Sequence, residues 1–83
     1  MKYFVYILQS VKDLSYYIGV TNNLPRRIKE HNHGLSKSTK SKRPLNLIYS
    51  EKMDDIKSAY KREKYLKSLK KRKCIEKLIL TQR

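Results

Sequence analysis

Three runs of apolar residues alternate with polar segments along the chain and predict three β-strands. The first strand covers residues 3–9 and contains the aromatic and β-branched stretch Tyr3 to Leu8, which is typical of a strand buried on both faces. The other two strands cover residues 16–20 and 45–52. Because only a short polar segment separates the first two runs, they predict an antiparallel hairpin.

Helices are predicted where capping residues precede periodic apolar positions. Asn23 and Pro25 mark the start of the first helix, and Gly34 marks its end. A Ser- and Lys-rich segment, residues 35–44, is expected to be an exposed, mobile loop. Asp54 or Asp55 caps the second helix, and a basic break precedes the third. The three predicted helices cover residues 24–33, 55–69 and 75–80.

The length of 83 residues suffices for one domain. We therefore predict a single domain over residues 1–83 with an α+β fold. Its three-stranded antiparallel sheet is flanked by helices, in the order β-β-α-β-α-α.

Charge is the strongest compositional feature. The chain holds 21 Lys and Arg against 7 Asp and Glu, a formal net charge of +14. Such an excess destabilises a small body by self-repulsion unless a polyanion binds it, and phosphate backbones are the usual polyanion. We therefore expect a nucleic-acid partner, DNA rather than RNA.

Cysteine content and apolar run lengths indicate the compartment. The single Cys74 cannot form an intramolecular disulfide, and no second Cys is present to build a zinc site with the two His residues. The run from Tyr3 to Leu8 is too short for a signal-peptide core or a membrane span. A cytoplasmic protein without membrane contact is expected.

Glu63 interrupts the apolar stripe of the second predicted helix, which Ile56, Ala59, Tyr60 and Leu66 form at helical spacing. A carboxylate there is costly unless a cation or hydrogen-bond donors meet it. Two interpretations stay open: a half-buried ion pair with a Lys or Arg, or a ligand for a metal ion. Lys61, Arg62, Lys64 and Lys67 are expected to point elsewhere and stay solvated.

The first predicted helix places Arg27 and His31 four residues apart, along the border of an inward face formed by Leu24, Ile28 and Leu35. Arg26 faces away. An Arg can hold a phosphate through two hydrogen bonds, and a neutral His can exchange a proton near pH 7. The alternative is that both side chains lie at the edge of the helix without a functional role.

The alternation of side chains along the two predicted hairpin strands assigns each tyrosine to one face of the sheet. Tyr6 shares a face with Phe4 and Leu8, and Tyr17 shares one with Gly19. Gly19 is expected to leave room for a ligand backbone beside Tyr17. Taken singly, each tyrosine is better explained as part of the core, where strand tyrosines commonly lie.

Together these positions resemble the GIY-YIG nuclease family, in particular its small single-domain bacterial members related to the N-terminal catalytic module of the excinuclease C subunit. Tyr17-Ile18-Gly19 matches the second family motif, and Val5-Tyr6-Ile7 stands at the first, with its tyrosine kept but its glycine absent. Arg27, His31 and Glu63 fall where the family has its arginine, histidine and metal-binding glutamate. The asparagine that some members carry beyond that glutamate has no counterpart here.

The resemblance implies a metal-dependent phosphodiesterase that acts on DNA in repair or processing. Glu63 would bind one Mg²⁺ or Mn²⁺, and Arg27 would grip the phosphate oxygens. Tyr6 would act as general base, which requires its phenol pKa to fall; His31 could relay the proton and Tyr17 could hydrogen-bond the water or the phosphate. The division of roles among Tyr6, Tyr17 and His31 stays open.

Nucleic-acid contacts are expected from basic side chains of the 35–44 segment and the second helix, namely Lys37, Lys40, Lys42, Arg43, Arg62 and Lys67. The alternative function is a nucleic-acid-binding module that keeps the fold without the catalytic activity. This alternative explains the positive charge equally well. A small ribosome-associated basic protein is a third interpretation that rests on charge alone. No recognition domain is visible, so a partner protein is a candidate source of substrate specificity.

Overall fold

The computed structural model describes residues 2–69 and 72–81. Over these residues it contains three antiparallel strands and three α-helices, which confirms the predicted α+β class. The elements are, in chain order, β1 (Tyr3–Ser10), β2 (Tyr16–Thr21), α1 (Leu24–Asn32), a 3₁₀ turn η1 (Lys40–Lys42), β3 (Leu45–Met53), α2 (Ile56–Ser68) and α3 (Arg72–Thr81). The basic break expected before the third helix falls partly on residues 70–71, which lie outside the described residues.

The strand order is β2-β1-β3, so the most apolar strand lies in the centre of the sheet. Side chains from Val5 to Leu8 are at most 1% exposed, which confirms the predicted burial on both faces. The register pairs Tyr6 with Gly19 on β2 and with Ser50 on β3. The strand order makes β2 and β3 the edge strands, and the register places Gly19 of β2 directly beside the central Tyr6.

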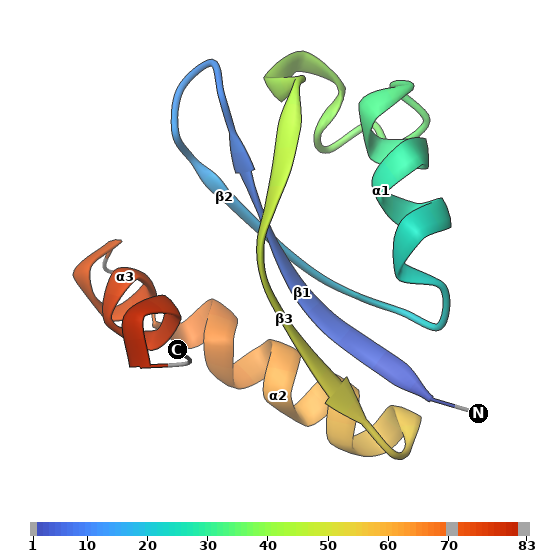
Figure 1. Cartoon of the computed structure of the whole chain (residues 1–83), viewed down its shortest axis with the longest axis vertical. Helices are drawn as coiled ribbons and strands as arrows, with labels where there is room; N and C mark the ends of the chain where they lie inside the picture. The colour runs from blue at the N-terminus through green and yellow to red at the C-terminus, as the bar shows by residue number, and fades with distance from the viewer. Residues whose placement is uncertain (1, 70–71, 82–83) are drawn as a thin grey trace.

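Helices cover both faces of this sheet: α1 lies on one side, and α2 and α3 lie on the other (Figure 1). On the α1 side, Leu24 and Ile28 pack against a cluster around Tyr6 and Leu8. The opposite side holds the larger cluster, made of Val5, Ile7, Ile18, Tyr49, Ala59, Leu66 and Ile75. Alternation of side chains along β1 supplies both clusters from one strand.

The start of α1 agrees with its sequence signals. The Asn23 side chain accepts a hydrogen bond from the backbone of Arg26, and a proline occupies the first turn. The helix ends at Asn32, and Gly34 follows with φ of +78°. Leu35 was expected on the inward face but is 71% exposed, because the chain turns away at Gly34 before reaching it.

The apolar stripe of α2 is only partly buried. Ala59 and Leu66 are fully buried against the sheet, whereas Ile56 is 39% and Tyr60 54% exposed. The expectation of one continuous core-facing stripe was therefore wrong for its first turn. Ile56 and Tyr60 instead line a surface pocket that α1 also borders.

Most residues of the 35–44 segment are exposed, as expected, but the segment also makes specific contacts with the rest of the fold. It contains the turn η1, and Thr39 is completely buried. The Ser10 hydroxyl donates to the Lys42 carbonyl at 2.7 Å, and the Lys42 ammonium donates to Asp13 at 3.1 Å. These contacts hold the segment against β1 and the turn that follows it.

Among the described residues, no helix is long and apolar enough to cross a membrane.

Candidate functional site

The ring of Tyr6 lies across Gly19 of the edge strand. A Cβ atom at position 19 would lie 2.5 Å from the Tyr6 hydroxyl oxygen and 2.7 Å from the ring carbon that bears it. The space at Gly19 is therefore occupied by the end of Tyr6, which corrects the expectation that it admits a ligand backbone. Because β2 is one of the two edge strands, this arrangement carries the hydroxyl from the central strand toward that edge of the sheet.

A buried chain of side chains begins at that hydroxyl. The Tyr6 oxygen lies 3.0 Å from Nε2 of His31, and Nδ1 of His31 lies 2.7 Å from the Thr39 hydroxyl. His31 is fully buried, although it was expected at the border of α1. The difference arises because the 35–44 segment folds over α1 and covers the imidazole with Thr39.

Burial controls the protonation of this chain. It lowers the pKa of His31, and the positive charge of Arg27 lowers that pKa further, against a rise from Glu30. Burial also raises the pKa of Tyr6, while a hydrogen bond from Arg27 opposes the rise. Both groups are therefore neutral near pH 7.

The donors around Tyr6 favour one direction for this chain of hydrogen bonds. Arg27 has only donors to offer the Tyr6 oxygen, so the Tyr6 O–H is left to donate to Nε2 of His31. The ring proton of neutral His31 then lies on Nδ1 and is donated to Thr39. In this arrangement Thr39 sets the tautomer, and Nε2 is the proton acceptor for Tyr6.

Tyr17 completes a group of three rings. Its centroid lies 4.9 Å from that of His31 and 6.4 Å from that of Tyr6. Unlike Tyr6, Tyr17 is partly exposed. The three residues that the sequence singled out on β1, β2 and α1 thus lie together.

Arg27 is held beside Tyr6 by Glu30, an acid outside the positions predicted to form the site. Its Nη1 donates to Glu30 at 3.0 Å, and the same carboxylate lies 3.8 Å from Arg26. This contact raises the pKa of Arg27. Arg27 is 33% exposed and Arg26 65%, which agrees with the predicted orientation of the two side chains. Glu30 could have been found from its spacing of three and four residues after the two arginines.

Glu63 lies close enough to Tyr6 for its charge to raise the pKa of that phenol. Its side chain is 21% exposed and pairs with Lys67 at 3.2 Å, so the expectation that Lys67 points elsewhere was wrong. Lys67 is 56% exposed, and such surface pairs contribute little to stability. The carboxylate can therefore exchange this partner for another cation.

Metal binding would depend on few protein ligands. Within residues 2–69 and 72–81, no group of three or more His, Cys, Asp or Glu is placed to hold a metal ion. Mg²⁺ commonly keeps several waters and binds one or two carboxylates together with substrate phosphates. A single carboxylate such as Glu63, displaceable from Lys67 and near Tyr6, fits that mode.

Among the basic residues expected to contact nucleic acid, Arg62 is engaged within the protein. It donates two hydrogen bonds of 2.8 Å to the Glu51 carboxylate, which also accepts from Tyr49. Burial raises the pKa of Glu51, but the bonds from Arg62 and Tyr49 outweigh burial and hold that pKa below its usual value. The expectation of a freely solvated Arg62 was wrong, because this pair joins α2 to β3.

Basic residues of the 35–44 segment lie apart from α2. Lys40 and Arg43 line a polar pocket together, and Nε of Arg43 donates to the Lys40 carbonyl at 2.8 Å. Lys42 is bound to Asp13, as described above, and Lys37 is exposed. The structure therefore does not gather the six predicted contact residues into one patch.

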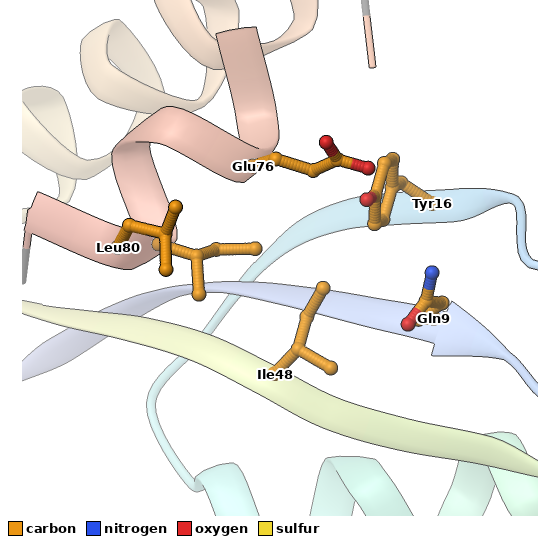
Figure 2. A pocket seen from close by; sticks show the side chains of 6 residues that line it. Gln9, Tyr16, Ile48, Glu76 and Leu80 are labelled. Carbon is orange, nitrogen blue, oxygen red and sulfur yellow. The ribbon is translucent and has the colours of Figure 1, made fainter. Parts of the chain in front are cut away.

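A second pocket, of about 390 Å³, lies on the opposite face of the sheet, beneath α3 (Figure 2). Ile48 and Leu80 supply its apolar walls, and Glu76 and Tyr16 lie at its rim. Gln9 lines it from β1, on the face away from Tyr6. This pocket does not share side chains with the group around Tyr6.

Comparisons with known proteins show the family and support the fold. The model of the GIY-YIG catalytic domain matches residues 2–77. Over 67 residues the chain is 46% identical to the UPF0213 protein CPE1444 of Clostridium perfringens, covering 80% of this chain and 71% of that protein. It is 40% identical over 72 residues to the UPF0213 protein YazA of Bacillus subtilis, covering 86% and 72%. The solution NMR structure of the UPF0213 protein BH0048 from Bacillus halodurans superposes with a TM-score of 0.62 at 34% identity, covering 98% of this chain and 85% of that one.

Proposed function

Because the chain belongs to the GIY-YIG family, we propose that it is a metal-dependent endonuclease that hydrolyses phosphodiester bonds in DNA. The observation that carries the proposal is the buried contact between Tyr6 and His31, with Arg27 and the charge of Glu63 both acting on the same phenol. We further propose that residues 1–83 form one nuclease domain, which acts in the cytoplasm in DNA repair or processing.

Proton transfer begins at the Tyr6 hydroxyl. Its oxygen takes a proton from the attacking water while its own proton moves to Nε2 of His31, 3.0 Å away. Burial keeps His31 neutral near pH 7, so that Nε2 has a lone pair available for that proton. The raised pKa of Tyr6 makes a free phenolate unfavourable, so the transfer to His31 accompanies the attack.

Arg27 would neutralise the charge of the phosphate. To bind the non-bridging oxygens, its guanidinium would give up its ion pair with Glu30. Tyr17, partly exposed beside His31, is placed to hydrogen-bond the water or the phosphate. A Mg²⁺ or Mn²⁺ ion held by Glu63, water and substrate oxygens would supply further positive charge at the reacting phosphate.

A binding module without catalysis is the second candidate, and the Glu63–Lys67 ion pair favours it. In that case Glu63 would neutralise a neighbouring lysine, and the basic surface would bind nucleic acid without cutting it. A partner protein that supplies substrate choice is compatible with either function.

One experiment separates the two candidates. Purified protein is incubated with branched, nicked, duplex and single-stranded DNA and with RNA, each in Mg²⁺, Mn²⁺ or EDTA. If the chain is a nuclease, we expect it to cleave DNA in the presence of metal and EDTA to abolish that cleavage. The Glu63→Gln variant should not cleave, while its DNA binding and thermal midpoint stay unchanged. Glu76→Gln, which removes the same charge from α3, is the matched control and should cleave normally. Binding without cleavage of every substrate would assign the chain to the second candidate.

A further inference from the structure

A pocket of about 380 Å³ lies between α1 and the first turns of α2, beside the strand β2. One wall is apolar and is formed by Ile56 and Tyr60 from α2. Arg26, Arg27 and Glu30 from α1 form a charged wall. The pocket thus offers an apolar surface and two guanidinium groups to the same occupant.

Tyr60 presents an exposed ring at this pocket. Its side chain is 54% exposed, and among the described residues no other ring or guanidinium covers it. Tyr65, on the same helix and 53% exposed, is instead covered by the Arg62 guanidinium at 5.2 Å. The face of Tyr60 is therefore available to a ligand, whereas that of Tyr65 already has a partner.

Arg27 joins this pocket to the proposed reaction centre. It lines the pocket, and it acts directly on the Tyr6 hydroxyl. An occupant of the pocket therefore lies next to a phosphate bound by Arg27. On a nucleic-acid strand, the group next to a phosphate is a nucleoside, followed by another phosphate.

We propose that this pocket binds an unpaired nucleotide of DNA beside the bond that is cut, with its base against Tyr60 and its phosphate on Arg26. The inference rests on the proposed function only for the position of the cut. Aromatic side chains next to cationic groups are the usual surface for unpaired bases. In a continuous duplex each base is stacked between its neighbours, so only a flap, a branch or a frayed end presents a free base face. The substrate class is therefore DNA with an unpaired nucleotide at the cleavage site.

The test measures binding in EDTA, where no cleavage occurs. The probes are a 2-aminopurine single-stranded oligonucleotide and a fully paired duplex of the same length. We expect Tyr60→Ala to weaken binding of the single strand about tenfold, the loss of one base–aromatic stack. Duplex binding should stay within about twofold, because phosphate contacts dominate it. Tyr60→Phe should bind the single strand like the unaltered protein.

Tyr65→Ala is the matched control, since it removes an equally exposed tyrosine from the same helix. Equal losses for Tyr60→Ala and Tyr65→Ala, equal losses on both probes, or no loss at all would overturn the proposed pocket. A protein that needs Tyr60 to bind the single strand but never cleaves would contradict the nuclease proposal alone. Cleavage that proceeds without any dependence of binding on Tyr60 would contradict the pocket alone.

Discussion

Gly19 determines where the Tyr6 hydroxyl can lie. Any side chain at this position would meet the end of the Tyr6 ring at 2.5–2.7 Å, and the buried ring has little room to retreat. We expect Gly19→Ala to destabilise the fold by about 2 kcal/mol, the usual cost of overpacking a core. Urea unfolding of both proteins measures this difference.

A double variant shows whether Tyr6 causes that cost. In a Tyr6→Leu background the ring is absent, so adding Gly19→Ala should cost little. If Gly19→Ala destabilised both backgrounds equally, strand propensity rather than the ring would explain the glycine.

Burial of neutral His31 makes stability depend on pH. The pKa of His31 is lowered in the folded protein, so the unfolded chain binds a proton first as pH falls below about 6.5. Stability should therefore be complete above that pH and decline below it, until the folded imidazole is also protonated. The urea midpoint between pH 8 and pH 5 measures this decline.

Replacement of the two histidines locates that effect. His31→Gln should flatten the pH dependence over this range, whereas His33→Gln, which alters an exposed side chain, should preserve it. An unchanged decline in His31→Gln would assign the pH dependence to another group.

The Thr39 hydroxyl lies 2.7 Å from Nδ1 and is therefore positioned to determine the tautomer of His31. Thr39→Val keeps the shape but leaves a buried N–H without a partner, which costs about 1–3 kcal/mol unless the proton moves to Nε2. We expect ¹⁵N NMR of His31 to show the proton on Nδ1 in the unaltered protein and in Thr39→Ser, and a shift toward Nε2 in Thr39→Val. The same tautomer in all three proteins would remove Thr39 from the proton path.

At the scale of elements, α1 could be predicted from the sequence because its signals are local. The Asn23 cap and the proline act within one turn of the helix they start. The burial of His31 could not be predicted in this way, since Thr39, eight residues on, covers it only after the 35–44 segment folds back. Periodicity likewise placed Ala59 and Leu66 correctly but could not show that Tyr60 borders a pocket, because that depends on how α2 crosses the sheet.

Glu30 occupies the two arginines of α1 that could bind phosphate. Its carboxylate holds Arg27 and lies near Arg26, so it competes with any phosphate for both guanidinium groups. We expect Glu30→Gln to increase DNA affinity about threefold at low salt. In this variant the weak surface ion pair between Arg27 and Glu30 no longer has to break before Arg27 binds a phosphate. Fluorescence anisotropy with a labelled duplex measures this change.

Glu76→Gln separates that local effect from net charge. It removes the same charge from α3, on the opposite face of the sheet (Figure 1). An equal gain for Glu30→Gln and Glu76→Gln would show that overall charge alone controls binding.

At the scale of the molecule, most acidic side chains already form ion pairs or cap a helix within the protein. Five of the seven form ion pairs among the described residues, namely Asp13, Glu30, Glu51, Asp54 and Glu63. Asp55 caps α2. The net charge of +14 could be predicted from composition, but this distribution could not, because the pair of Glu51 with Arg62 joins residues far apart in sequence. The excess of positive charge is consequently left without acids to balance it.

Salt should therefore act on stability and on binding in opposite directions. Without nucleic acid, added salt screens the repulsion among the unbalanced Lys and Arg side chains, so the thermal midpoint should rise. DNA affinity should fall at the same time, by about 0.9 log unit per phosphate contact for each log unit of salt on duplex DNA. Thermal unfolding and anisotropy over one NaCl series measure both slopes. A midpoint that fell with salt would mean that the ion pairs outweigh the net repulsion, and affinity that barely changed would exclude phosphate contacts as the main source of binding.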